Sequence, residues 1–163
     1  MNILIAPNAF KHSLDAQTAA EAIALGFEQS RLACTCQLFP VGDGGDGTAS
    51  LIIKKRNGKL VEAKVHDALG REITAQFGLI DNDKTAVIEM ADAAGIRLLN
   101  KEELNPLVAN TIGTGEMIRQ ALDKGARKII IGMGGSATVD GGMGILISLG
   151  ISFLNIDNEA ITS

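Results

Sequence analysis

The chain has few aromatic residues. Its 163 residues include five Phe and neither Trp nor Tyr. Proteins bind single-stranded nucleic acids largely by stacking bases on aromatic side chains, and they bind duplexes through clustered Lys and Arg. Here the 15 Lys and Arg residues are scattered and are outnumbered by 19 Asp and Glu residues. We therefore expect no nucleic-acid partner.

Long apolar runs are also missing. No run approaches the roughly 20 residues that a membrane-spanning helix needs. The apolar run at the amino end has no basic region and is interrupted by Pro7, which does not fit a secretory signal peptide. We therefore expect a cytoplasmic protein with no membrane partner.

Cysteine is scarce as well. The only two cysteines are Cys34 and Cys36, and a disulfide between residues two apart on a strand would be strained. Two thiols without a nearby His or further Cys make a poor zinc site. We expect both cysteines to be reduced and to serve in packing.

Glycine, in contrast, is abundant and is concentrated in loops. The densest stretch, residues 132–144, follows the run Ile129 to Ile131 and contains six glycines. Ordering a glycine costs roughly 0.5–1 kcal/mol relative to alanine in a regular element, so a simple connection would use fewer. Glycine also lets backbone N–H groups approach an anion closely. The stretch therefore predicts an anion-binding loop between a strand and a helix.

A second glycine-rich loop, residues 42–48, contains four glycines together with Asp43 and Asp46. Carboxylates three apart in so flexible a loop could hold Mg²⁺, or one of them could act as a general base. The alternative is a glycine-rich turn in which the Asp residues are incidental. Lys11 lies in an earlier loop, at a position where α/β proteins bind ligands, although a solvated loop lysine would fit the spacing equally.

Hydrophobic periodicity predicts an α/β fold. Strands are expected at residues 2–6, 36–41, 129–131 and 151–154, and helices at about 16–27, 49–56, 114–124 and 145–149. Ser13 or Asp15 would cap the first of these helices and Thr114 the third. We expect a Rossmann-like or flavodoxin-like parallel sheet with helices.

Residues 59–90 alternate apolar and polar side chains with period two, and turn signals fall at 68–70 and 81–84. This pattern predicts a small antiparallel β-meander that interrupts the α/β body. We therefore divide the chain into a body, residues 1–58 and 91–163, and an inserted subdomain, residues 59–90. Glu89 and Asp92 near its end are candidate site residues, although acids that face outward from a strand end are common.

Five motifs resemble, in order and spacing, those of the bacterial type-1 glycerate kinases. They are APNAFK at 6–11 with Ser13 after it, PVGDGGDGT at 40–48, EMADAAG at 89–95, GTGE at 113–116, and GMGGSATVDGG at 132–142. The resemblance covers essentially the whole chain. It implies an ATP-dependent kinase that phosphorylates D-glycerate, typically at the 2-hydroxyl. It also implies a two-part α/β protein.

The chain departs from the pattern of these kinases at four positions and in length. Asn8 and Ala9 replace a carboxylate and a hydroxyl, Asp46 replaces a glutamate, and Val139 replaces an asparagine. Family members are much longer, so the chain resembles the amino-terminal half of an incomplete two-domain kinase. We expect a missing carboxyl-terminal half, or a homo-oligomer, to complete it.

The glycine pattern and the resemblance together predict a site for ATP, Mg²⁺ and D-glycerate. Lys11 would neutralise a phosphate or the glycerate carboxylate. Asp43 or Asp46 would hold Mg²⁺, and Asp140 would orient the attacking hydroxyl or accept its proton. The expected substrate and phosphate ligands are Ser13, Gly44, Gly45, Thr114, Gly134, Gly135, Ser136 and Thr138.

Two alternatives stay open. Residues 132–137 fit the dinucleotide fingerprint G-x-G-x-x-A, and Asp157 lies where a ribose ligand is expected, so an NAD(P)-dependent oxidoreductase is one of them. A Rossmann helix should begin within the fingerprint, whereas Asp140, Gly141 and Gly142 keep this loop open. The other alternative is a catalytically incomplete fragment that folds without turnover.

Overall fold

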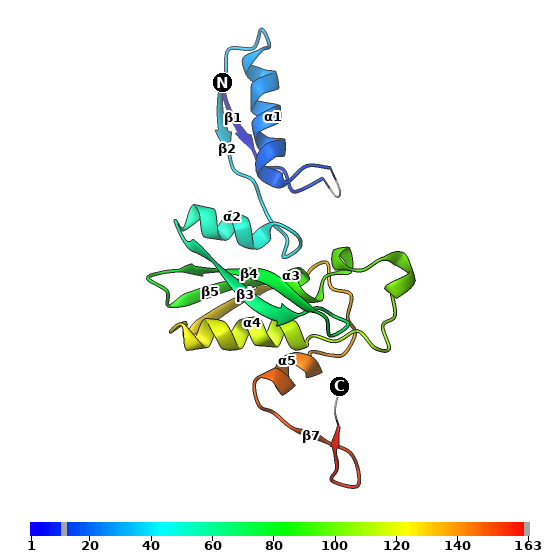
Figure 1. Cartoon of the computed structure of the whole chain (residues 1–163). Helices are drawn as coiled ribbons and strands as arrows, with labels where there is room; N and C mark the ends of the chain where they lie inside the picture. Colours follow the sequence, from blue (N-terminus) through cyan, green and yellow to red (C-terminus); the bar gives the residue numbers. More distant parts are fainter. Residues whose placement is uncertain (11–12, 162–163) are drawn as a thin grey trace.

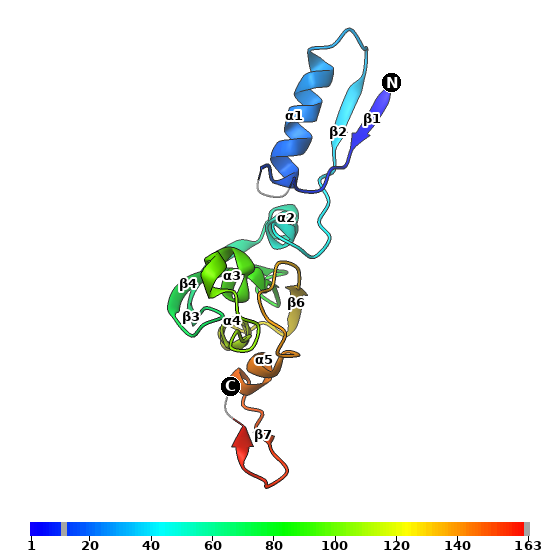
Figure 2. The same cartoon turned by 90° about the vertical axis from the view of Figure 1, so that its right-hand side faces the viewer.

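The computed structural model describes residues 1–10 and 13–161, and it has an elongated shape with three parts (Figure 1). A two-stranded parallel sheet with one helix lies at one end. A four-stranded sheet covered by helices forms the middle, and a short hairpin lies at the other end. Figure 2 shows the same order of parts after a quarter turn. No helix in the part of the chain described is long and apolar enough to cross a bilayer.

The amino-terminal part consists of β1 (Asn2–Ile5), α1 (Ala16–Glu28) and β2 (Thr35–Leu38), and β1 pairs in parallel with β2. The Asp15 carboxylate accepts a hydrogen bond of 2.8 Å from the Thr18 N–H, so of the two predicted caps, Ser13 and Asp15, it is Asp15 that caps α1. The core of this part is small. It contains the buried residues Ile5, Ala20 and Ala24 and the partly buried residues Ile3, Phe27 and Cys36.

The central sheet has the strand order β3-β4-β5-β6. Its strands are β3 (Lys59–His66), β4 (Glu72–Ile80), β5 (Thr85–Glu89) and β6 (Lys128–Gly132). The first three strands are antiparallel, which confirms the predicted meander, and β6 joins β5 in parallel. The meander and residues 128–132 therefore share one sheet. The division into a body and an inserted subdomain stays a prediction.

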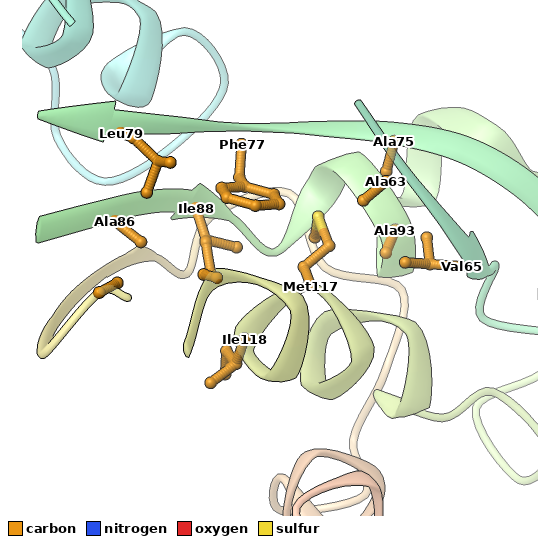
Figure 3. Close-up of a cluster of buried hydrophobic side chains, with 12 residues drawn as sticks. Ala63, Val65, Ala75, Phe77, Leu79, Ala86, Ile88, Ala93, Met117 and Ile118 are labelled. Atoms are coloured by element: carbon orange, nitrogen blue, oxygen red, sulfur yellow. The ribbon is translucent and has the colours of Figure 1, made fainter. Parts of the chain in front are cut away.

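Helices cover both faces of this sheet. On one face, α4 (Ile112–Asp123) packs against a cluster that includes Phe77, Ile88 and Met117 (Figure 3). On the other face, α2 (Thr48–Lys55) packs Ile53 against Val87. Every residue of β5 is buried, as expected for a strand with apolar layers on both sides.

The remaining elements are α3 (Ala91–Ala94), η1 (Ile96–Leu98), η2 (Lys101–Glu103), α5 (Met143–Ser148), β7 (Phe153–Leu154) and β8 (Ala160–Ile161). The predicted mixed α/β class is confirmed, with the two parallel strand pairs divided between two sheets. The second strand ends at Leu38, earlier than expected. The expectation that Thr114 caps its helix is wrong, because α4 already begins at Ile112 with Thr111 at the N-cap. Both cysteines are free, as predicted.

Candidate active site

Two glycine-rich loops meet at the carboxyl ends of β5 and β6. The first glycine loop, residues 42–47, leads into α2, and the second, residues 133–142, leads from β6 to α5. The Gly134 N–H donates a hydrogen bond of 2.8 Å to the Gly44 carbonyl. A Cβ atom at Gly134 would lie 2.5 Å from the Cα atom of Gly45. The loops therefore approach as closely as they do because residue 134 has no side chain.

The second glycine loop is also bonded to the segment that follows β5. The Ile96 N–H donates to the Gly135 carbonyl over 2.8 Å, and the Ala137 N–H donates to the Ala94 carbonyl over 2.8 Å. These bonds attach the loop to α3 and η1. Within the described residues, the N–H groups of Gly135 and Ser136 donate to no protein acceptor. Two adjacent amides therefore remain for an anion.

Other amides predicted to bind phosphate are already engaged. The Gly44 N–H donates to the Thr48 hydroxyl over 3.1 Å, and the Gly45 N–H donates to Asp43 Oδ1 over 3.0 Å. The Gly134 N–H is bonded to Gly44, as described above. These three glycines hold the loops in shape in this structure, and their predicted role as phosphate ligands stays a prediction.

Glu89 fixes the first glycine loop to the end of β5. Glu89 is 6% exposed, and its carboxylate accepts hydrogen bonds from the N–H groups of Ala49, over 2.6 Å, and Gly47, over 3.2 Å. Gly47, the N-cap residue of α2, has no side chain that could cap the helix. The carboxylate of Glu89, at the end of β5, caps it instead. Burial raises the pKa of Glu89, against the opposing effect of these two amides.

Arg97 is a charged site residue that sequence reasoning missed. Its guanidinium donates to Asp46 Oδ1 over 3.0 Å and also pairs with Asp92. Burial raises the pKa of Asp92, although Arg97 acts in the opposite direction. A signal was present in the sequence, because Arg97 follows the EMADAAG motif by two residues and is the only Lys or Arg between Lys84 and Lys101.

The first glycine loop carries both predicted metal ligands. Asp43 accepts the Gly45 amide, and Asp46 is paired with Arg97. In the part of the chain that the structure describes, no three His, Cys, Asp or Glu side chains gather as a metal-binding group. Mg²⁺ in kinases is commonly held by one or two carboxylates together with phosphate oxygens. The donor chemistry of Asp43 and Asp46 therefore fits such an ion.

Asp140 ties the second glycine loop to the starts of α4 and α5. Its Oδ2 atom accepts hydrogen bonds from the Thr111 N–H (2.9 Å), the Thr111 hydroxyl (2.7 Å) and the Gly144 N–H (3.1 Å). Its Oδ1 atom accepts one from the Gly142 N–H over 3.0 Å. Burial acts to raise the pKa of Asp140, but the hydrogen bonds outweigh it and lower the pKa.

We expect Asp140→Asn to destabilise the chain by about 1–3 kcal/mol at neutral pH, because at least one of these donors loses its acceptor. A lowered folded-state pKa means that the charged carboxylate stabilises the fold above the unfolded value of 3.8 and stops doing so as the pH falls through the folded value. The difference in unfolding free energy between the wild type and Asp140→Asn should therefore shrink below that pH. Urea unfolding at several pH values measures it, and a difference that is independent of pH would contradict this role.

The other predicted residues are placed as follows. The Ser136 hydroxyl lies 2.7 Å from the Thr138 hydroxyl, both in the second glycine loop. Thr114 is fully buried, and its hydroxyl has no partner among the described residues. Ser13 is exposed, and its N–H donates to the Phe10 carbonyl over 2.9 Å. Lys11 lies outside the described residues.

A hollow of about 380 Å³ lies between the loop before α1 and the first glycine loop. Its polar lining includes Asn8 and Asp15 from the amino-terminal part and Asp46, Ser50 and Lys54 from the first glycine loop and α2. The contact between Gly134 and Gly44 brings the two glycine loops together and places the acids of the first loop beside the second. Asp140 lies at the far end of the second loop, where it contacts α4.

Comparison with known proteins decides the family. The sequence model of the Glycerate kinase family matches residues 3–163. The chain belongs to the glycerate kinase family. Relatives include the glycerate kinase of Bacillus subtilis (strain 168), 47% identical over 99% of this chain, and the glycerate 2-kinase of Escherichia coli (strain K12), 43% identical over 99% of it.

A solved structure also supports the assignment of this chain to the glycerate kinase family. The crystal structure solved under the name glycerate kinase 2 from Salmonella typhimurium LT2 matches with a TM-score of 0.80 and 39% identity. The match covers 99% of this chain and 43% of the other. The chain likewise spans 42% of the length of the Bacillus subtilis and Escherichia coli relatives. It therefore corresponds to less than half of a family member.

The oxidoreductase alternative is not favoured. The Bacillus subtilis and Escherichia coli relatives are both named as glycerate kinases. In addition, α5 begins at Met143, after the fingerprint at residues 132–137 has ended, and the Gly134 N–H is bonded to Gly44. A dinucleotide pyrophosphate needs a helix that begins within the fingerprint. Asp157, the expected ribose ligand, lies in the exposed turn between β7 and β8.

Proposed function

We propose that this chain forms the amino-terminal part of an ATP-dependent kinase that transfers the γ-phosphoryl group to a hydroxyl of D-glycerate. The observation that carries the proposal is the contact between the two glycine loops at Gly44 and Gly134, beside Asp43, Asp46 and Arg97, in a chain of this family. Phosphoryl transfer asks a protein mainly for positioning and for neutralisation of charge. Amides without a protein acceptor, a guanidinium and carboxylates supply the positioning and the neutralisation of charge.

Each part of the site has a role in this proposal. The N–H groups of Gly135 and Ser136 bind phosphoryl oxygens, as donors held in advance at the place where charge develops. Arg97 and Lys11 neutralise phosphate or the glycerate carboxylate. Asp43, with Asp46 once it leaves Arg97, would hold Mg²⁺, which supplies charge neutralisation between the phosphates when bound.

Asp140 has a more restricted role than a free carboxylate. Its Oδ2 atom accepts three hydrogen bonds, whereas Oδ1 accepts one. Each carboxylate oxygen has two lone pairs, so Oδ1 keeps acceptor capacity with which it would orient the substrate hydroxyl. The lowered pKa keeps the group ionised at neutral pH but makes it a weak proton acceptor. Orientation is therefore the role we assign to it.

The 2-hydroxyl is the proposed acceptor, in line with the name of the Escherichia coli relative. Because ATP is the donor, we place the reaction in the cytoplasm. The chain alone is catalytically incomplete in this proposal, since a site formed by two parts loses most of its positioning when one part is absent.

The test joins residues 1–163 to the remaining carboxyl-terminal sequence of the Bacillus subtilis relative; this fusion is called the chimera below. We expect the chimera to consume ATP with D-glycerate and to release 2-phosphoglycerate, which ³¹P NMR distinguishes from the 3-isomer. Residues 1–163 alone should show no appreciable turnover. A folded chimera that binds but does not phosphorylate D-glycerate would contradict the proposal, and release of the 3-isomer would contradict the choice of hydroxyl.

A further inference from the structure

Arg97 lies between two carboxylates that are held with different firmness. Its Nη1 atom donates to Asp46 Oδ1 over 3.0 Å, and its Nη2 atom pairs with Asp92. Asp92 lies in α3 between buried alanines, and its side chain is 26% exposed. The side chain of Asp46 is 59% exposed, in a loop where a glycine stands on each side of it. Of the two carboxylates, Asp46 is therefore the one that can leave Arg97.

The Asp46 carboxylate also lies next to the second glycine loop. A Cβ atom at Gly135 would be 3.1 Å from Asp46 Oδ1, the same atom that accepts the hydrogen bond from Arg97. The backbone beside Arg97 contacts this loop as well, because the Ile96 N–H donates to the Gly135 carbonyl over 2.8 Å. An anion that replaced Asp46 on Arg97 would therefore lie beside Gly135, whose N–H is proposed to bind a phosphoryl oxygen.

The charges around Arg97 favour replacement of Asp46 over addition of a further anion. Two carboxylates share one guanidinium, which leaves one negative charge in excess, so a third anion beside them would be repelled. A guanidinium is also well suited to a carboxylate, because its planar N–H groups match the two oxygens. The Asp46 side chain occupies this position with a carboxylate already. A substrate carboxylate fits the same place.

Resting on the function proposed above, we infer that Arg97 recognises the carboxylate of the acceptor, in the place that Asp46 occupies in this structure. Asp92 is the positioning residue that orients the guanidinium. Arg97 thereby selects a hydroxy acid over a neutral polyol. The 2-hydroxyl of D-glycerate is on the carbon next to the carboxylate, so this binding mode brings the 2-hydroxyl closer to Gly135 than the 3-hydroxyl. Asp46, once replaced, becomes available to Mg²⁺, so D-glycerate and Mg²⁺ should each strengthen the binding of the other.

Isothermal titration calorimetry of the chimera with D-glycerate, without ATP or metal, tests this exchange apart from turnover. Arg97→Gln should weaken binding by about ten- to a hundredfold, the usual loss for a hydrogen bond to a charged group. Arg97→Lys should recover only part of this loss, because an ammonium group lacks the planar fork. Asp46→Asn should instead tighten binding by about two- to fivefold, since an exposed ion pair no longer competes. If Arg97→Gln does not fold, Asp46→Asn decides, and weaker binding by it would overturn the inference.

Two further titrations test Asp92 and the link to the metal. Asp92→Asn should weaken D-glycerate binding about threefold or more and leave binding of a non-hydrolysable ATP analogue unchanged, because the guanidinium loses one of its two charged partners. With the analogue bound, saturating D-glycerate should lower the Kd of Mn²⁺, followed by electron paramagnetic resonance, about two- to fivefold. The same addition should leave the Kd of Mn²⁺ unchanged in Asp46→Asn. A Kd of Mn²⁺ in the wild type that does not respond to D-glycerate would overturn the exchange.

Arg56→Gln is the matched control. Arg56 pairs with Asp81 and is the C-cap residue of α2, at the end of the helix away from the first glycine loop. It should leave all of these affinities unchanged. D-glycerate binding that Arg97→Gln leaves unchanged would overturn this inference alone. So would a loss confined to the ATP analogue, because Arg97 would then bind phosphate. A wild-type chimera that does not bind D-glycerate would overturn the proposed function and this inference with it.

Discussion

Gly134→Ala is expected to lower kcat/KM of the chimera by about 10²-fold or more, since misplacement of a catalytic group by about 1 Å can cost that much. The added Cβ atom would lie 2.5 Å from the Gly45 Cα and 3.1 Å from the Gly44 carbonyl oxygen. Both contacts are with backbone, which cannot turn away as a side chain can. The two glycine loops must therefore separate, and the amides of Gly135 and Ser136 move away from the acids of the first loop.

Gly26→Ala is the matched control for this substitution. Gly26 lies in α1, and a Cβ atom there would meet nothing within 4 Å. Alanine is favoured over glycine inside a helix by about 1 kcal/mol, so this variant should be slightly more stable and fully active. Steady-state kinetics with D-glycerate, together with thermal unfolding, compares the two. If Gly134→Ala kept wild-type turnover, the close approach of the loops would have no catalytic importance.

Asp43→Asn is expected to lower kcat by about 10²-fold or more, because binding of a metal ion at the phosphates contributes several kcal/mol to transition-state stabilisation and each 1.4 kcal/mol is a factor of ten. The substitution is informative because it changes charge with little change in shape. The Gly45 N–H donates to Asp43 Oδ1 over 3.0 Å, and the Asn side-chain oxygen can accept the same hydrogen bond. The variant should therefore keep this hydrogen bond.

The Mg²⁺ dependence of the Asp43 variant separates the proposed role from general damage. We expect a higher Mg²⁺ concentration for half-maximal activity, which a smaller folded fraction alone would not produce. Asp83→Asn serves as a control, because Asp83 lies in the turn between β4 and β5 and pairs with Lys59. Turnover by Asp43→Asn within a few-fold of wild type would show that this carboxylate holds no essential ion.

Local patterns in the sequence were sufficient to predict most of the elements. Period-two alternation identified the meander, because one side of each strand faces the core beneath α4. The cap at Asp15 could be predicted because its partner, Thr18, is only three residues away. The glycine loops could also be predicted, because they are recognised from composition alone.

Contacts between distant residues could not be predicted in this way. Glu89 was a candidate site residue because of its place at the end of the predicted meander, but nothing local showed that its carboxylate would cap α2 through Gly47 and Ala49. Thr114 was expected at a helix start, whereas α4 begins two residues earlier, where Asp140 binds Thr111. Such caps depend on the tertiary fold, which brings together residues far apart in sequence.

The site itself was predicted unevenly for the same reason. The two glycine loops, which the sequence predicts separately, are in direct contact. Their amides were treated as equivalent, although hydrogen bonds within the loops engage those of Gly44, Gly45 and Gly134. Asp46 was assigned to a metal without its partner Arg97. Which donors remain available for a ligand follows only from the folded geometry.

A crystal structure of the chimera with Mg²⁺, D-glycerate and a non-hydrolysable ATP analogue measures where the γ-phosphoryl group lies. We expect its oxygens within about 3 Å of the Gly135 and Ser136 nitrogens, a normal hydrogen-bond distance, with the ion bound to Asp43. A γ-phosphoryl group bound away from both glycine loops, with those two amides exposed to water, would contradict the assignment of these loops to phosphoryl transfer.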